Sequence, residues 1–231
     1  SEEGWIDHVY ANNAGIMMDR NLGATSATPG DVGAIGLLYQ WGRKDPFMGS
    51  CAKSGTTLAA STGSWSTVSG SQTIYFAEEN PMTYIIGSYE WCSGQGSRGN
   101  PGEYRWNDDH KTLYDPCPVG YCVPKGGNDG FWATALGTSD ATSAGTEWDS
   151  ANYGHHWTLA DGTTAAWYPA VGYRFGSKGE LYNVGSVFCW SASYNPNNVV
   201  CEAYNLFVNF SVDPARSNPR SSGCSVRCMK E

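Results

Sequence analysis

Short apolar and aromatic runs, separated by Gly, Asn and Pro, dominate the second half of the chain. They are Trp157-Thr-Leu, Ala165-Ala-Trp-Tyr-Pro-Ala, Phe188-Cys-Trp-Ser-Ala, Leu206-Phe-Val-Asn-Phe and Cys224-Ser-Val-Arg-Cys. Runs of this length between turn-forming residues are typical of short strands. The five runs therefore predict a compact, mostly antiparallel sheet.

The first clear pattern near the N-terminus is a hairpin within residues 10–24. Asn12 to Gly15 has the composition of a turn, and Ile16 and Met18 follow at the spacing of one strand face.

Two other segments carry helix signals. Asp31 can cap a segment in which apolar residues recur at helical spacing over 35–39, although two glycines leave helix and strand both open. Asn128 can cap a helix over 129–136.

The Ser/Thr/Gly-rich stretches 48–75 and 93–110 predict surface loops, which Cys51 and Cys92 could join if both are insertions. With no internal repeat and no linker between two cores, we expect residues 1–231 to form a single domain.

The composition agrees with a fold of short strands and loops. The chain has 40% hydrophobic residues, enough for a core, and it is rich in Gly (29), Trp (10) and Tyr (14) but low in charge (16%). Glycine and large aromatic side chains favour irregular loops and short strands over long helices.

The distribution of charged and apolar residues argues against two classes of partner, nucleic acids and membranes. A net charge of −8 with thinly scattered Lys and Arg offers no basic stripe for nucleic acid. No apolar run approaches the roughly 20 residues that span a bilayer, so we expect no direct membrane insertion. The chain opens Ser-Glu-Glu, which we interpret as the start of a mature or trimmed fragment, the C-terminal part of a longer surface protein.

Eight cysteines in an acidic, Trp-rich chain indicate an oxidising compartment and at least one structural disulfide. They are Cys51, Cys92, Cys117, Cys122, Cys189, Cys201, Cys224 and Cys228. Their spacing does not match a zinc ribbon, and by itself it does not choose among about 105 possible pairings.

Several blocks together resemble the Fibrobacter succinogenes major paralogous domain, which is common in Bacteroidetes surface proteins. The blocks are Met18-Asp-Arg-Asn-Leu-Gly-Ala, Tyr39-Gln-Trp-Gly-Arg-Lys-Asp-Pro-Phe, Tyr114-Asp-Pro-Cys-Pro-Val-Gly-Tyr, Trp190-Ser-Ala-Ser and Ser225-Val-Arg-Cys. They occur in the expected order from about residue 17 to the C-terminus. Each block alone is weak, but the joint match is specific.

The resemblance implies an α+β domain of C-type-lectin-like fold, similar to formylglycine-generating enzymes, with a small twisted antiparallel sheet, two short helices and much loop. It also implies a disulfide between Cys117 and Cys228. A covalent loop of that length stabilises a fold by about 4–5 kcal/mol in the chain-entropy model.

Domains of this kind also resemble the variable proteins of diversity-generating retroelements, some of which lie on adhesive pilus tips of gut Bacteroides. In those systems template adenines are mutated, so Asn codons change to many residues but never to Lys, Gln, Glu, Met or Trp. Between Gly179 and Met229 the chain has no Lys and no Gln, whereas Glu202 departs from the pattern. The resemblance thus implies a variable binding region at about 181–231, although an acidic domain can also lack Lys by chance.

Within this region we expect exposed apolar side chains to supply contact area and small polar ones to supply adaptable hydrogen bonds. The candidate ligand-binding residues are Phe188, Cys189, Tyr194, Asn197, Val199, Val200, Cys201, Asn205, Phe207, Phe210, Ala215, Ser217, Pro219, Ser221 and Ser222. Trp190, Val226 and Cys228 are assigned to the scaffold.

Signals for metal binding and catalysis are weak. Trp106-Asn-Asp matches a short calcium motif of C-type lectins, but the further oxygen ligands that calcium needs cannot be assembled. His155 and His156 would point to opposite faces of a strand. Cysteine chemistry like that of the formylglycine-generating enzymes would need Cys224 together with Cys228, which the resemblance commits to a disulfide. We therefore expect no catalytic residue, no metal and no cofactor.

Three functions remain as hypotheses. The first is an extracellular adhesin domain on a pilus tip or a lipoprotein, which binds a protein or glycan on another cell and contacts other pilus subunits through a preceding region. The second is a carbohydrate-binding module with a fixed row of exposed Trp or Tyr. The third, a pilin subunit that polymerises by strand donation, fits poorly with a C-terminus held by a disulfide. A formylglycine-generating-type enzyme stays open as a further alternative.

Overall fold

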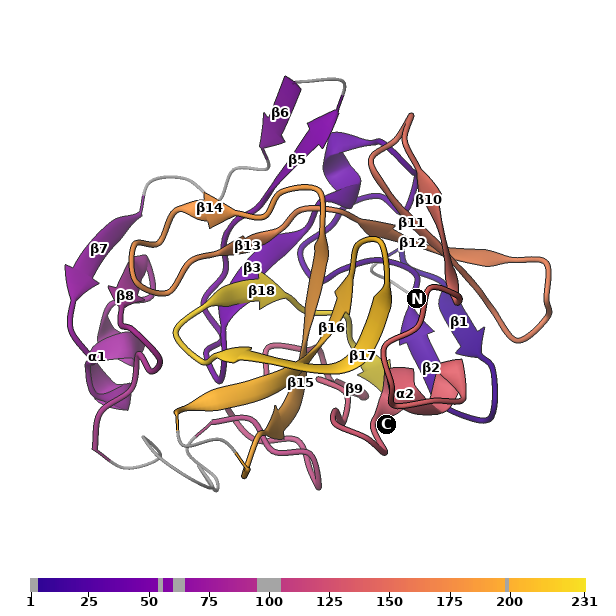
Figure 1. Ribbon diagram of the computed structural model, residues 1–231. Helices are drawn as coiled ribbons and strands as arrows, with labels where there is room; N and C mark the ends of the chain where they lie inside the picture. Colours follow the sequence, from indigo (N-terminus) through magenta and orange to yellow (C-terminus); the bar gives the residue numbers. More distant parts are fainter. Residues whose placement is uncertain (1–3, 54–55, 60–64, 95–104, 198–199) are drawn as a thin grey trace.

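The computed structural model describes residues 4–53, 56–59, 65–94, 105–197 and 200–231, with the backbone alone over 50–59. These residues form mostly strands, together with two α-helices, α1 (Ile74–Glu79) and α2 (Phe131–Leu136), and the 3-10 helix η1 (Val32–Ala34) (Figure 1). The expected α+β class, dominated by sheet, is confirmed. Over the described residues no helix has the length and apolar character to cross a membrane.

The largest sheet has eight strands and is assembled mainly from the C-terminal half of the chain. Its main path runs β14 (Leu181–Tyr182), β13 (Tyr173–Arg174), β18 (Gly223–Ser225), β15 (Val187–Tyr194), β16 (Glu202–Val208) and β17 (Val212–Pro219). Two N-terminal strands extend it, because β3 (Leu37–Gln40) pairs with β18 and β4 (Phe47–Met48) pairs with β3.

A four-stranded sheet brings the two ends of the chain together. Its order is β1 (Asp7–Tyr10), β2 (Gly15–Met18), β19 (Met229–Lys230) and β9 (Tyr121–Cys122). Strand β1 and the C-terminus lie on the same side of the molecule, beside β2 and α2 (Figure 1). Next to β19, Cys228 is bonded to Cys117, which confirms the disulfide that the family resemblance implies.

Three smaller sheets complete the fold. Strands β10 (Thr146–Asp149), β11 (Gly154–Thr158) and β12 (Ala165–Pro169) form an antiparallel sheet. Strands β5 (Ser50–Lys53) and β6 (Thr56–Ala59) form a hairpin, and β7 (Ser66–Ser69) pairs in parallel with β8 (Thr83–Ile86) across α1. All five runs expected as strands overlap strands, but they belong to two sheets rather than one.

The N-terminal hairpin is confirmed, with β1 and β2 in antiparallel register. Its turn requires left-handed backbone at Asn12 (φ 57°) and Asn13 (φ 55°), a conformation that Asn adopts more readily than most residues. Two positions after Asn13, Gly15 has a φ of 132°, which residues with a side chain rarely adopt. The backbone preferences of the turn residues therefore determine where this hairpin forms.

The two helix signals are correct in place but not in every detail. The Asp31 carboxylate accepts a hydrogen bond from Gly33 N and caps η1, and the chain then changes to strand β3, so the segment contains both helix and strand. The helix expected over 129–136 is α2, but its N-cap is Gly130 with no side-chain cap, so the Asn128 cap is wrong.

The loop expectations fail in part. The stretch 48–75 contains β5, β6 and β7 and the start of α1, whose N-cap Thr73 accepts a hydrogen bond from Phe76 N. Their Ser/Thr/Gly composition gives no apolar alternation, which is why the pattern missed them. Of the stretch 93–110, residues 95–104 lie outside the described part, and the Cys51 side chain that was expected to join the two stretches lies outside it too.

Buried tryptophans connect the sheet to the segments that pack on it. The Trp190 indole donates to Tyr39 O at 2.8 Å, and the Trp41 indole donates to Ser191 O at the same distance. Each indole thus fills core volume and satisfies a buried carbonyl. The assignment of Trp190, Val226 and Cys228 to the scaffold is consistent with their burial, since each has 0% exposure.

Candidate ligand-binding surface

The C-terminal region folds into two consecutive hairpins, β15–β16 and β16–β17. The loop 195–201 joins the first pair at one end of the sheet, and the turn 209–211 joins the second pair at the opposite end (Figure 1). In the antiparallel register, Phe188 is opposite Phe207 and Cys189 is opposite Leu206.

Both faces of β15 and β16 are covered by core. Cys189 and Leu206 pack in one cluster with Tyr10 and Trp157, whereas Phe188 and Phe207 pack in a second cluster on the other face. A strand buried on both faces presents few side chains to solvent.

Six of the expected ligand residues are therefore buried, and their assignment to an exposed surface is wrong. They are Phe188 (2% exposed), Cys189 (0%), Asn205 (1%), Phe207 (7%), Ser221 (0%) and Ser222 (1%). Burial also raises the pKa of the Cys189 thiol to about 12, so the group is a neutral core side chain at ordinary pH.

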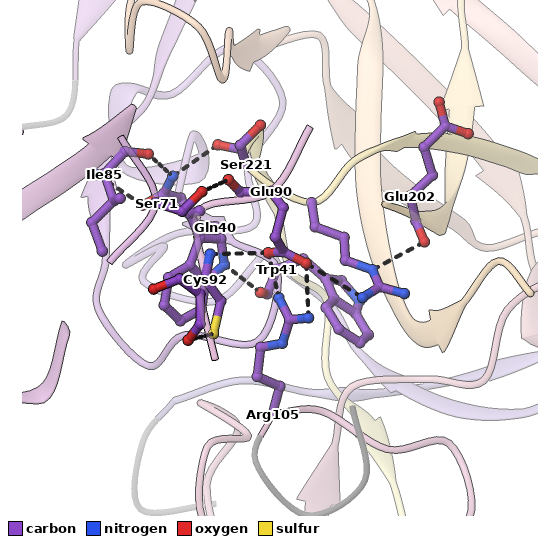
Figure 2. A network of polar contacts seen from close by, with 12 residues as sticks. Gln40, Trp41, Ser71, Ile85, Glu90, Cys92, Arg105, Glu202 and Ser221 are labelled. Atoms are coloured by element: carbon purple, nitrogen blue, oxygen red, sulfur yellow. Dashed lines mark hydrogen bonds and ion pairs between the residues drawn. The ribbon is translucent and has the colours of Figure 1, made fainter. Parts of the chain in front are cut away.

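Ser221 belongs to a buried polar network that ties the tail to the N-terminal half (Figure 2). Gln40 Nε2 donates to both Ile85 O and Ser221 O at 2.8 Å. In the same region Arg105 donates to both carboxylate oxygens of Glu90, at 2.6 and 2.9 Å. Ser221 thus acts through its backbone as a structural residue.

The Glu90 carboxylate also accepts from Arg220 at 3.4 Å, and both guanidinium groups lie 5.0 Å from the ring of Trp41. The three charged groups are well removed from water, with side-chain exposures of 0% for Arg105, 2% for Arg220 and 10% for Glu90. This network fixes the last turn before β18.

The other candidate residues keep some contact with solvent. Asn197 is exposed, and Tyr194, Val200, Cys201, Ala215, Ser217 and Pro219 are half-buried. Val199 lies outside the described residues. Phe210 is 97% exposed at the β16–β17 turn. The expected surface is thus divided between the two ends of the hairpins and the outer strand β17.

Two of these residues open on a cavity. Val200 and Cys201 line a hollow of about 680 Å³ together with the segment 86–94 and Ser177. Tyr194 lines a second hollow of about 400 Å³ beside 106–109 and 125–129. Val200 and Cys201 on one side and Tyr194 on the other thus border two separate hollows.

An aromatic stripe that the sequence did not predict crosses the eight-stranded sheet. We define it as Tyr173, Phe175, Tyr182, Phe188, Phe207 and Arg216. The Tyr173 ring lies 4.6 Å from that of Phe188, and the Phe188 ring lies 5.0 Å from that of Phe207.

At its two ends the stripe reaches the surface. Tyr182 is 56% exposed and Phe175 is 37% exposed on the β13–β14 hairpin. At the other end the exposed Arg216 guanidinium lies 4.0 Å from the Phe207 ring centroid and covers it. Burial raises the pKa of the Tyr173 phenol, so this side chain stays neutral. The stripe thus has exposed aromatic rings at one end, a cation at the other, and buried rings of the sheet between them.

One sequence signal could have revealed part of the stripe. Tyr173 and Phe175 alternate along the chain, and after the Gly-containing turn Tyr182 pairs with Tyr173 in a hairpin. Aromatic residues at alternate positions of a hairpin share one face. Arg216 carries no such signal, because its position over Phe207 depends on the irregular register between Asn205 and Phe207.

Several rings of the stripe meet at steep angles. Tyr173 meets Phe175 and Tyr182 at interplanar angles of 77° and 82°, so the rings present edges as well as faces. Tyr, Phe and Arg are the side chains enriched in the cores of protein interfaces.

The other motifs singled out in the sequence have structural contacts. Trp106 is 1% exposed and donates to Tyr114 O, while Asp108 accepts from Ser193 Oγ at 2.7 Å. His156 lies 3.0 Å from the Asp149 carboxylate, and its neighbour His155 is buried in β11. Cys228 is in the disulfide, so it forms no dithiol with Cys224.

Comparison with protein families, with curated proteins and with solved structures found no match to this chain.

Proposed function

We propose that this chain is a ligand-binding domain of a cell-surface protein, which recognises a protein or glycan on another cell through the exposed part of the aromatic stripe. The observation that carries the proposal is the stripe itself: Tyr182, Phe175 and Arg216 are exposed at its two ends, and the rings that connect the two ends are packed in the core. Rigid aromatic anchors lose little conformational entropy on binding.

The proposal includes a C-type-lectin-like fold and an extracellular location. The fold assignment is supported by the paired N- and C-terminal strands, the two short helices and the disulfide near the C-terminus. A disulfide of this kind is typical of oxidising compartments, which supports a place on a pilus tip or a lipoprotein.

The proposal includes diversification of the tail, but at fewer positions than the sequence pattern indicated. A position buried between two core clusters cannot change freely without loss of stability. The changeable positions are therefore those with solvent contact, namely Tyr194, Asn197, Val200, Cys201, Phe210, Ala215, Ser217 and Pro219.

The binding surface is tested by substitution. The chain is screened against immobilised extracellular proteins and glycans, and the affinity for each hit is measured for Tyr182→Ala, Arg216→Ala and the control Tyr75→Ala. Tyr75 is 72% exposed on α1, outside the stripe. We expect the two stripe variants to lose roughly tenfold or more in affinity and the control to lose none. Unchanged affinity in both stripe variants would overturn the assignment.

Diversification is tested on the gene. The nucleotide sequence around codons 187–224 and its flanks is searched for a near-copy that differs mainly at adenines and lies beside a reverse transcriptase gene. The absence of such a copy, with related sequences that vary elsewhere, would remove diversification from the proposal and leave the binding surface to its own test.

A further inference from the structure

A separate cavity of about 560 Å³ lies at the opposite end of the hairpins from the loop 195–201. It is formed by the β10–β11 sheet, the segment 183–186 and the turn 209–211. Its volume falls in the range of about 300–1,000 Å³ that is usual for small-molecule sites. The residues that give it chemical character are Trp148, Tyr153, His155, Asn183, Asn209 and Phe210.

Aromatic rings form its walls. The Trp148 ring lies 5.1 Å from Tyr153 and 5.0 Å from the His155 imidazole. Trp148 is 42% exposed and Phe210 is 97% exposed, so two large apolar surfaces remain in water at the rim. A ligand that covers these side chains would gain the favourable transfer of their apolar surface out of water.

The polar groups in the wall are neutral. The residues that line the cavity include Asn183, Asn209 and several hydroxyl side chains, and none of the described lining residues is Asp, Glu, Lys or Arg. His155 is 2% exposed and is held by a 3.0 Å hydrogen bond between its Nδ1 and Thr146 Oγ1. Burial lowers the pKa of His155 to about 4, so the ring is uncharged at neutral pH.

Two features mark the cavity as more than a gap between elements. His155 Nε2 is a buried polar atom with no hydrogen-bond partner, which is uncommon in a folded protein. Tyr153 (φ 61°) and Asn183 (φ 50°) both have left-handed backbone. For a bulky residue such as Tyr this conformation is a strained one, and such residues gather at ligand sites.

We propose that this cavity binds a neutral pyranose unit of a glycan. A pyranose has an apolar C–H face that packs on an aromatic ring, as Trp148 and Phe210 offer, and hydroxyl groups at its edge that pair with amides such as Asn183 and Asn209. A charged sugar would lose hydration without meeting an opposite charge in the wall. The site uses none of the stripe residues, although it shares Phe210 with the changeable positions of the proposed function.

The test uses the whole chain and defined probes. Methyl glycosides of glucose, galactose, mannose, N-acetylglucosamine and fucose are titrated up to tens of millimolar, with N-acetylneuraminic acid and glucuronate as charged comparators. Binding is followed by saturation-transfer NMR and by the indole N–H signal of Trp148, assigned with the Trp148→Phe variant. We expect at least one neutral glycoside to bind and to shift that signal.

Variants then locate the site. Phe210→Ala removes an exposed side chain and leaves the core intact, and we expect it to weaken glycoside binding roughly tenfold. Leu113→Ala, another exposed apolar residue (84%), serves as the matched control and should bind as the parent does. Tyr182→Ala should also leave glycoside binding unchanged, which separates this site from the stripe.

Three results would overturn the proposal. The first is that no neutral glycoside binds over the full titration. The second is that the charged comparators bind more strongly than the neutral glycosides. The third is that glycoside binding is unchanged in Phe210→Ala. None of these results bears on the effect of Tyr182→Ala or Arg216→Ala on the ligands of the stripe, so the two proposals can fail separately.

Discussion

At the scale of single residues, similar side chains in the tail have opposite surroundings. Phe207 is 7% exposed between Phe188 and Arg216, whereas Phe210, three positions later, is 97% exposed. The residue type does not distinguish them. What separates them is that Phe207 lies in β16 and Phe210 lies in the turn beyond it.

The substitution Phe207→Ala should therefore lower the free energy of unfolding by about 3 kcal/mol, because it leaves a cavity beside Phe188 and removes the ring on which Arg216 packs. Phe210→Ala should change the free energy of unfolding by about 0.5 kcal/mol or less. Urea unfolding of the two variants, with equal slopes against denaturant, checks the difference. A similar stability for both variants would contradict the burial of Phe207.

The stability of the fold should be far more sensitive to the loss of Glu90, which faces two buried guanidinium groups, than to the loss of an exposed carboxylate. Glu90→Gln removes the charge that faces Arg105 and Arg220, and an uncompensated buried charge lowers stability by about 3–5 kcal/mol. Asp129→Asn is the matched control, because Asp129 and Lys125 form an ion pair at 2.9 Å with side-chain exposures of 79% and 48%. Loss of this ion pair should lower the free energy of unfolding by about 1 kcal/mol or less, as measured by thermal or urea unfolding.

At the scale of elements, the sequence predicts best where the signal is local. The β1–β2 hairpin was predictable, because Asn12, Asn13 and Gly15 supply the backbone angles that its turn needs. The placement of β11, β12, β15, β16 and β18 was also predictable from their apolar runs. The partition of those strands between two sheets was not, because it depends on pairing between distant segments such as β3 and β18.

The candidate site was predictable only in part for the same reason. Runs such as Phe188-Cys-Trp-Ser-Ala show no polar alternation, which is the mark of a strand covered on both faces. That pattern argued for the burial of Phe188 and Cys189 over their exposure. Arg216 and Tyr182 reach the two ends of one aromatic stripe only through the order of strands in the folded sheet, and no local pattern encodes that order.

Strand β11 should make stability depend on pH through His155. Burial lowers the pKa of His155 to about 4 in the folded chain, against about 6.5 in an unfolded one. Between these values the unfolded chain binds more protons, so stability is full above about pH 6.5 and falls as the pH drops towards about 4. Urea midpoints measured from about pH 7 to about pH 4 should decline across this interval.

The variant His155→Gln is the control, because it has no group that titrates at this position. Its decline with falling pH should be shallower than that of the parent. Part of the slope should remain, since burial also lowers the pKa of His8. An identical slope in parent and variant would assign the dependence to other groups.

At the scale of the whole molecule, the disulfide between Cys117 and Cys228 closes the tail against the middle of the chain. It spans 111 residues and joins the segment before β9 to the segment before β19. A covalent loop of this length restricts the unfolded chain far more than the folded one.

Cys117→Ser together with Cys228→Ser should therefore lower the free energy of unfolding by about 4–5 kcal/mol. Reduction of the parent should give a similar loss, while Cys122→Ser, at a half-buried thiol that is not part of this bond, should not remove the sensitivity to reductant. Unfolding in urea with and without dithiothreitol measures both effects. A parent midpoint that does not move on reduction would contradict the role of the bond.

The same covalent closure has a mechanical consequence. A tensile force applied through a ligand on Tyr182 or Arg216 would pull on residues inside the closed loop, between its two anchoring cysteines. The last strands could then shear from their neighbours, but the tail could not unravel as a loose end. The distance over which the chain yields under load would be limited by the bond, and an intact bond would let separated strands return to register.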